Sequence, residues 1–260
     1  MKKILLSLIL ITYTVFLYSQ TIPDMILVIS GSFKMGSSGG YDDEAPIHTV
    51  KITSNYYISK YEITVAQYRE FCTATSKAFP ASPKKDWYEE HDAVEEWKWT
   101  DNHPIVNISW FDAVEYCEWL SEETGETYTL PTEAQWEYAA RGGSITKSYT
   151  YSGSNTINDV AWYDETTYER GTRAVGQLKP NELGIYDMSG NACEWCLDGY
   201  QSYSSGTKTD PFTANTGPYR VIRGGCWYFV EDMNRVSFRD GPKPFLNKFY
   251  YGFRIVKTID

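Results

Sequence analysis

The sequence predicts an α+β domain that is low in regular secondary structure. Three helix starts share one signal, a Ser or Thr followed three positions later by Asp or Gln, as in a capping box. The pairs are Thr64 with Gln67, Ser109 with Asp112, and Thr132 with Gln135. Short alternating segments at 49–53 and 56–59 are typical of strands, and Gly, Asn, Ser and Pro clusters separate them. Because no helical pattern occurs over 146–219, long packed loops are expected there.

The first twenty residues have the pattern of an export signal. Lys2 and Lys3 precede an apolar run over 4–17, and the small residue Ser19 follows. The run is too short to span a bilayer comfortably. Because no cysteine lies near its end, a lipid anchor is not indicated. We therefore expect a signal peptide over 1–20 and a protein exported to the periplasm, the outer surface or the medium. A buried first strand or an uncleaved anchor is the alternative.

The second and third helices have expected ends as well as starts. Apolar residues recur at helical spacing over 110–120, and Gly125 ends this helix because glycine tolerates a left-handed conformation. The third helix is expected to end at the Arg-Gly-Gly sequence 141–143. Glu133 and Glu137 are expected to be capping and surface groups of that helix.

The charge balance argues against one class of partner. The chain has 24 Lys and Arg against 34 Asp and Glu, so its formal net charge is −10 and its pI is near 4.9. Such a protein is not expected to bind nucleic acid, because phosphates are bound by basic surfaces. Aromatic residues make up 16% of the chain, with 22 Tyr and 9 Trp. This content favours surfaces that bind through flat ring contacts.

The five cysteines form no clear metal or disulfide pattern. An odd number in an exported chain leaves at least one thiol free, and the pairing of the others stays open. Cys193 and Cys196 have CxxC spacing, but there is no second such pair and the three histidines are scattered, so zinc is not expected. Cys72 and Cys117 lie in helical patterns and are expected to be small buried residues.

Seven motifs occur in the order found in a known family. They are 31–36 (GSFKMG), 61–64 (YEIT), 104–110 (PIVNISW), 130–143 (LPTEAQWEYAARGG), 181–191 (NELGIYDMSGN), 223–225 (RGG) and 252–254 (GFR). In this order they resemble the formylglycine-generating enzyme, or sulfatase-modifying factor, family. The resemblance implies one domain over 22–260 with an elaborated C-type-lectin-like α+β fold.

The resemblance implies oxidase chemistry for the family's enzymes but not for this chain. Their two copper-binding cysteines match Phe229 and Asn234, and neither side chain supplies the thiolate that Cu(I) prefers. Cys226 stands where the family usually has Ser. We therefore expect no copper and no formylglycine formation. An oxidase that uses Cys226 with Cys193 or Cys196 is the alternative. A related branch of iron enzymes carries a histidine module that does not fit in the chain.

One metal-binding loop of the family is matched residue by residue. The resemblance implies that Asp187 and Glu194 supply side-chain oxygens to a structural Ca²⁺ ion. Gly190 and Ala192 would add backbone carbonyls. A second family site would fall near 158–163, where its later ligands do not align. The alternative is that Asp187 and Glu194 only cap turns.

Aromatic and small residues gather near the end of the chain, over 227–254. The predicted ligand surface consists of Trp227, Tyr228, Phe229, Asp232, Phe238, Asp240, Phe245, Phe249 and Tyr250. Core packing is the alternative for about half of the rings. The framework around them resembles that of family members diversified by retroelements, in which mutated adenines turn Asn codons into Tyr, Phe or Asp. Glu231, Lys243 and Lys248 lie outside that codon set.

These features predict an exported binding protein that kept the scaffold of the family and lost its chemistry. Its ligand would be a protein or a glycan at the cell surface. Two alternatives stay open. One is an oxidase of the formylglycine-generating type that acts on a sulfatase cysteine. The other is a structural component of an envelope or motility complex.

Overall fold

The computed structural model describes residues 22–82, 99–167, 171–214 and 217–259. The expected signal peptide, residues 1–20, lies outside this part of the chain. Within the described ranges, no helix is both long enough and apolar enough to cross a membrane.

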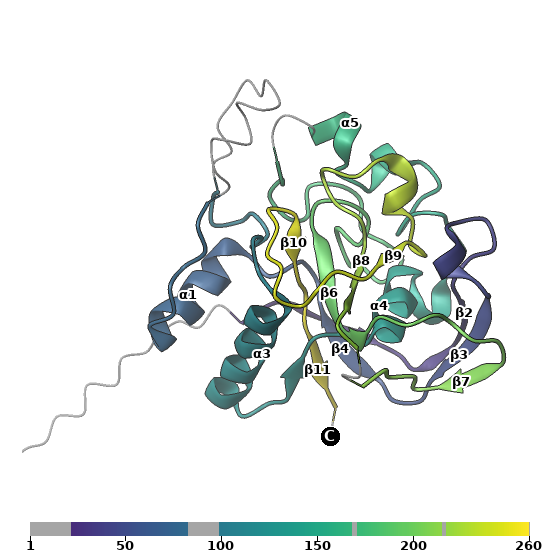
Figure 1. The fold of residues 1–260 in the computed structure, drawn as a ribbon, viewed down its shortest axis with the longest axis horizontal. Helices are drawn as coiled ribbons and strands as arrows, with labels where there is room; N and C mark the ends of the chain where they lie inside the picture. The colour runs from purple at the N-terminus through teal and green to yellow at the C-terminus, as the bar shows by residue number, and fades with distance from the viewer. Residues whose placement is uncertain (1–21, 83–98, 168–170, 215–216, 260) are drawn as a thin grey trace, which may run out of the picture.

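Three small sheets organise the described residues (Figure 1). The first is antiparallel and has the order β1-β4-β11-β5, with β1 at Met25–Val28, β4 at Tyr56–Ser59, β11 at Val256–Thr258 and β5 at Tyr128–Thr129. The second has the order β10-β6-β8-β9, with β10 at Tyr251–Gly252, β6 at Cys193–Gly199, β8 at Arg220–Arg223 and β9 at Arg239–Asp240. The third has the order β2-β3-β7, with β2 at Gly31–Met35, β3 at His48–Ile52 and β7 at Thr207–Thr209.

Three main helices begin where the sequence predicts. They are α1 at Val65–Thr75, α3 at Trp110–Thr124 and α4 at Glu133–Ala140. Each has a complete capping box, formed by Thr64, Ser109 and Thr132 respectively, so this prediction is confirmed. Gly125 follows α3 with a φ of 74°, the left-handed conformation expected at that helix end. The shorter helical turns are α5 at Asp164–Thr167, η1 at Asp42–Glu44, η2 at Gly143–Ile145, η3 at Ile157–Asp159 and η4 at Glu231–Asn234.

Four regular elements, η3, α5, β6 and β7, lie within 146–219, where helix-free loops are expected. The four-residue helix α5 lies there, so the prediction that this segment has no helix is wrong for one α-helical turn. Strand β6 also lies there, and its sequence shows no alternation because six of its seven residues are buried. A strand covered on both faces loses the polar and apolar period that would reveal it.

Aromatic rings join α1 and α3 to the C-terminal strands. Tyr68 of α1 stacks on Tyr116 of α3 with ring centroids 5.9 Å apart, and Tyr116 meets Phe253 at 5.3 Å. Cys72 and Cys117 are buried in the same cluster, as predicted. Phe253 lies between β10 and β11, so its packing against α3 holds these two strands in place.

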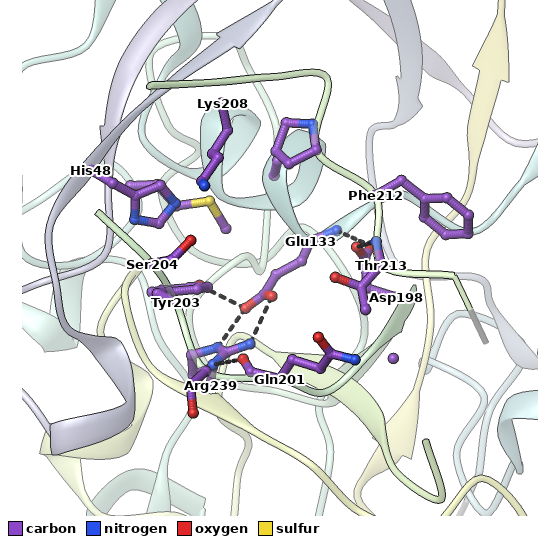
Figure 2. Close-up of a pocket in the computed structure, with 15 residues that line it drawn as sticks. His48, Glu133, Asp198, Gln201, Tyr203, Ser204, Lys208, Phe212, Thr213 and Arg239 are labelled. Atoms are coloured by element: carbon purple, nitrogen blue, oxygen red, sulfur yellow. Dashed lines mark hydrogen bonds and ion pairs between the residues drawn. The ribbon is translucent and has the colours of Figure 1, made fainter. Parts of the chain in front are cut away.

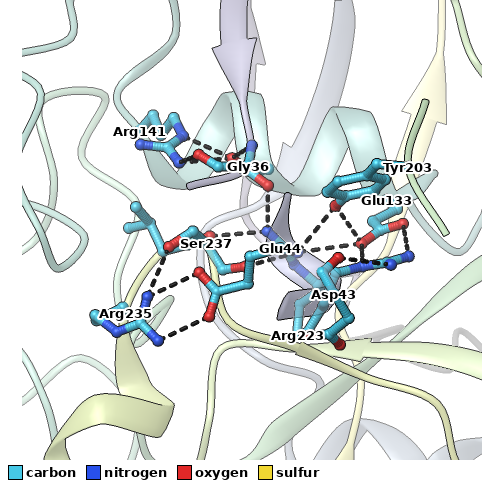
Figure 3. Close-up of polar contacts among 12 residues, drawn as sticks. Gly36, Asp43, Glu44, Glu133, Arg141, Tyr203, Arg223, Arg235 and Ser237 are labelled. Carbon is cyan, nitrogen blue, oxygen red and sulfur yellow. Dashed lines mark hydrogen bonds and ion pairs between the residues drawn. The ribbon is translucent and has the colours of Figure 1, made fainter. Parts of the chain in front are cut away.

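Helix α4 carries a buried ion-pair network (Figure 3). Arg223 contacts Glu133 at 3.1 Å and Glu137 at 2.5 Å, and Arg239 contacts Glu133 at 2.7 Å. The expectation that both glutamates are surface groups is therefore wrong, because α4 is buried on nearly every side. Burial alone raises the pKa of Glu133, but Arg239 and Arg223 together hold that pKa below its usual range.

Candidate functional site

A tight turn shapes the C-terminal segment just after β8. Gly225 has a φ of 70°, and a Cβ atom there would lie 2.3 Å from the carbonyl oxygen of Met233. Only glycine therefore lets the two sides of this turn approach so closely. The Asn234 side chain donates hydrogen bonds to the carbonyl oxygens of Val230, at 2.8 Å, and Phe229, at 3.2 Å. Asn234 thus closes the turn that positions the ring of Phe229.

Four half-buried rings form a cluster, here called the aromatic platform: Tyr228, Phe229, Phe249 and Tyr250. Tyr228 stacks on Tyr250 with centroids 5.9 Å apart and planes 19° apart. Tyr250 also contacts Phe249 at 5.1 Å and Phe229 at 5.4 Å. These separations lie in the range of favourable ring contacts, so the rings hold one another in place. Trp227, which is 1% exposed, packs beneath Tyr228.

The other predicted ligand-surface residues divide into two groups. Asp232, Asp240 and Phe245 are exposed, and the Phe245 side chain reaches 63% exposure. Phe238 is only 4% exposed and contacts the Phe229 ring at 6.0 Å. Trp227 and Phe238 therefore support the platform from inside and do not face a ligand. The other seven of the nine residues are half-buried or exposed, so direct ligand contact is geometrically open to them.

Two of the buried thiols lie together under the platform. Cys226 and Cys193 are both fully buried in one core cluster, where their side chains interact. The structure thus brings Cys226 next to Cys193, whereas Cys196 lies in a different core cluster. Burial, followed by the contact with Cys226, raises the pKa of Cys193 well above its usual range. Metals bind thiolates, so a metal ion bound here would have to displace the proton of the Cys193 thiol.

The predicted calcium residues lie in the loop that enters β6 and at the start of that strand. Asp187 and Glu194 are buried, and the Asp187 carboxylate accepts a hydrogen bond from the Gly176 amide at 2.7 Å. Both oxygens of Glu194 accept hydrogen bonds from Arg254, at 2.6 and 2.7 Å. One of them also accepts a hydrogen bond from the Trp136 indole at 2.6 Å.

A third buried carboxylate lies close to this pair. Glu62 accepts hydrogen bonds from the Ala192 amide at 2.9 Å and from the Asn191 side chain at 2.7 Å. Burial, with the nearby charges of Asp187 and Glu194, raises the pKa of Glu62 well above its usual range. Burial also raises the pKa of Asp187 to about 6. Three buried carboxyl groups, those of Glu62, Asp187 and Glu194, therefore surround the single positive charge of Arg254.

This donor set matches calcium in chemistry more than in geometry. Carboxylate and carbonyl oxygens are the ligands that Ca²⁺ prefers, and an excess of buried carboxylates is relieved by a cation. However, both Glu194 oxygens already accept hydrogen bonds from Arg254. Among the described residues, no three His, Cys, Asp or Glu side chains are arranged to hold a metal ion. Calcium binding through Asp187, Gly190, Ala192 and Glu194 remains a prediction.

Sequence reasoning assigned no role to two residues of this cluster. Glu62 lies in the motif 61–64 and Arg254 in the motif 252–254, and both motifs were visible in the sequence. Their spacing along the chain gives no sign that they meet. Only the fold brings β4, β6 and the C-terminal strands together, so the carboxylate cluster could not be read from the chain alone.

Comparison with known proteins places this geometry in context. A family model described as "Sulfatase-modifying factor enzyme 1-like domain" matches residues 15–259. The serine/threonine-protein kinase pkn1 of Chlamydia pneumoniae is 30% identical over 253 residues, with 91% of this chain and 38% of that protein covered. The formylglycine-generating enzyme of Streptomyces coelicolor is 29% identical over 283 residues, with 88% of each chain covered. The chain thus spans less than half the length of the chlamydial relative.

A solved structure has the same fold. Treponema denticola variable protein 1 superposes with a TM-score of 0.74 at 24% identity, with 90% of this chain and 95% of that chain covered. At this identity the likeness shows the fold alone. The fold expected from the seven motifs is therefore confirmed. The relatives' names describe different activities, so the fold does not decide what this chain does.

Proposed function

The chain belongs to the sulfatase-modifying factor family, and from this premise we propose that it is an exported binding protein whose ligand surface lies in the C-terminal segment 227–254. The aromatic platform is the observation that carries the proposal. Its rings are half-exposed, yet they are fixed by contacts with one another and with buried Trp227. Rigid rings lose little conformational entropy on binding, so they suit a recognition surface.

The contacts at the matched copper positions support binding over oxidation. Phe229 is a ring of the platform, and Asn234 closes the turn through its side-chain amide. Neither offers a sulfur to Cu(I), which prefers soft ligands. The proposed ligand is a protein or a glycan at the cell surface, and the net charge of −10 argues against nucleic acid.

Binding to envelope fragments of the producing organism tests this proposal. We expect the labelled mature protein to bind them, and the double variant Tyr228→Ala/Tyr250→Ala to lose at least tenfold in affinity, as for aromatic hot spots. Tyr219→Ala is the matched control, because Tyr219 is 42% exposed and lies at the other end of β8. Protease or periodate treatment of the fragments distinguishes a protein ligand from a glycan. Equal binding by the double variant and the wild type would reject the platform.

The same surface supports a proposal of diversification. One structural neighbour is named a variable protein, and here the exposed or half-buried positions Tyr228, Phe245 and Tyr250 carry residues that adenine mutation of Asn codons can produce. The framework residues Arg223 and Arg254 are fully buried. Sequencing the neighbouring DNA tests this idea. A reverse-transcriptase gene and a near-copy of the segment that differs mainly at adenines are expected, and their absence leaves a conventional binding surface.

A second candidate function is the divergent oxidase. The contact between Cys193 and Cys226 favours it, because two adjacent sulfurs are the minimum for a Cu(I) site. It predicts conversion of a sulfatase cysteine peptide that is lost in Cys226→Ser. A structural role in an envelope or motility complex is the remaining alternative, and stable co-purification with a membrane complex would favour it.

A further inference from the structure

A separate cavity lies between α4, β3, β7 and the loop over 199–213. Its volume is about 250 Å³. It shares no lining residue with the aromatic platform, so it is independent of the proposed binding surface. Figure 2 shows His48 and Lys208 on one side of this space and Phe212 on the opposite side, with Glu133 between them and Arg239 below.

The acidic groups of the cavity are already bound by the protein. Glu133 accepts hydrogen bonds from Tyr203 at 2.7 Å and from Arg239 at 2.7 and 2.9 Å. Asp198 accepts hydrogen bonds from the backbone amides of Glu133, at 2.7 Å, and Thr213, at 2.8 Å. Because Asp198 occupies the N-terminus of α4, that end of the helix is not available to a second anion.

Among the residues that the structure describes, Lys208 is the charged group of the cavity that has no counter-ion. It aligns with Val50 in the β3–β7 pairing, and Val50 is fully buried, so Lys208 projects toward the core side of the sheet. Its neighbours on β7, Thr207 and Thr209, are exposed. No ion pair involves Lys208 within the described residues. Figure 2 shows its amino group pointing into the cavity.

His48 and an apolar wall complete the lining. The Nδ1 atom of His48 lies 3.0 Å from the carbonyl oxygen of Pro46, so Nδ1 carries the proton and donates this hydrogen bond. The Nε2 atom takes no part in it. The His48 ring is 6% exposed and packs edge-on against Tyr203 at 4.8 Å. Phe212, which is 52% exposed, stands at the edge of the cavity with Pro211 beside it.

We propose that this cavity binds a small organic monocarboxylate, with the carboxylate at the Lys208 ammonium group and the apolar part against Phe212. A single unpaired cation suits one negative charge. A dianionic phosphate would carry excess charge next to Glu133 and Asp198. The volume lies below the range of roughly 300–1,000 Å³ typical of drug-sized ligands, so the molecule is small.

Three probes that share a phenyl ring and differ in charge test the charge requirement: benzoate, benzamide and benzylamine. In ligand-detected NMR titrations of the mature protein, benzoate should bind at least tenfold more tightly than the neutral amide or the cationic amine. Lys208→Gln should lose about tenfold or more in benzoate affinity, the effect of one charge-assisted hydrogen bond. Lys51→Gln is the matched control, since Lys51 is exposed on the adjacent strand β3 and does not line the cavity.

An inward lysine on an edge strand also discourages pairing between molecules, so Lys208→Gln could aggregate. Phe212→Ala provides an independent variant, because this side chain is exposed and lies outside the strand. It should weaken benzoate binding while leaving the sedimentation of the protein as in the wild type. The proposal is overturned if the three probes bind alike, if none binds at millimolar concentration, or if folded Lys208→Gln and Phe212→Ala both bind benzoate as wild type does.

Discussion

Buried charges in this molecule are stabilised by partners from distant parts of the chain. Glu137, which is fully buried, accepts hydrogen bonds from the Gly36 amide at 2.9 Å, from Arg141 at 2.8 Å and from Arg223 at 2.5 Å. The side chain of Arg223 is 0% exposed. Removing one charge from such a group leaves the others unpaired away from water, and this is costly.

The Glu137→Gln variant tests this arrangement at the residue scale. The amide keeps the size of the side chain but removes its charge, so the free energy of unfolding should fall by roughly 3–5 kcal/mol. Urea denaturation followed by circular dichroism measures the change. Arg69→Gln is the control, because Arg69 and its partner Asp101 are 48% and 67% exposed and should contribute about 1 kcal/mol or less. A similar small effect in both variants would contradict the description of the network.

At the scale of an element, the loop that enters β6 combines buried carboxyl groups with the predicted calcium ligands. The pKa of Asp187 is raised by burial to about 6. A carboxyl group with a raised pKa contributes stability that is complete below its unfolded pKa and is lost as the pH rises through its folded pKa. Asp187 therefore opposes folding increasingly between about pH 4 and pH 6 unless a cation is bound.

The measurement is thermal unfolding from pH 4 to pH 8, in chelator and in millimolar calcium. In chelator, the wild type should lose stability between about pH 4 and pH 6 more steeply than Asp187→Asn, and the difference between the two proteins isolates Asp187. Calcium at a hundredfold over its dissociation constant should add about 2.7 kcal/mol to the wild type only. Identical melting in chelator and in calcium would reject the ion, and parallel pH slopes would reject the role of Asp187.

The same scale shows what could be predicted from the sequence. Capping boxes at Thr64, Ser109 and Thr132 are local signals, and they gave the helix starts correctly. Strand β6 was missed because both of its faces are covered. The ion pairs of Glu133 and Glu137 were missed because their partners lie about 90 positions away, as the separations of 90 and 86 residues to Arg223 show. Motifs identified the family, but long-range contacts had to come from the fold.

At the scale of the whole molecule, the scaffold is that of a family with several activities. The chain has the fold and the motifs of the family. The motif resemblance implies that Phe229 and Asn234 stand where the family's enzymes have their copper-binding cysteines. We therefore predict that the purified protein binds no copper and makes no formylglycine. A cysteine-containing sulfatase peptide, incubated with Cu(I) and oxygen, should keep its mass. Loss of about eighteen mass units at the cysteine, dependent on Cys226, would show that the chain is an oxidase.

Hydroxyl-radical footprinting of the protein bound to envelope fragments tests the binding surface most directly. Oxidation of Tyr228, Phe249 and Tyr250 should fall on binding, because these half-exposed rings form the platform. Tyr219 and Phe212 should be oxidised as in the free protein, since both are exposed and lie outside the platform. Protection of these platform rings, with unchanged oxidation of Tyr219 and Phe212, is the predicted result. Unchanged oxidation of the platform in the bound protein would contradict a ligand surface in the C-terminal segment.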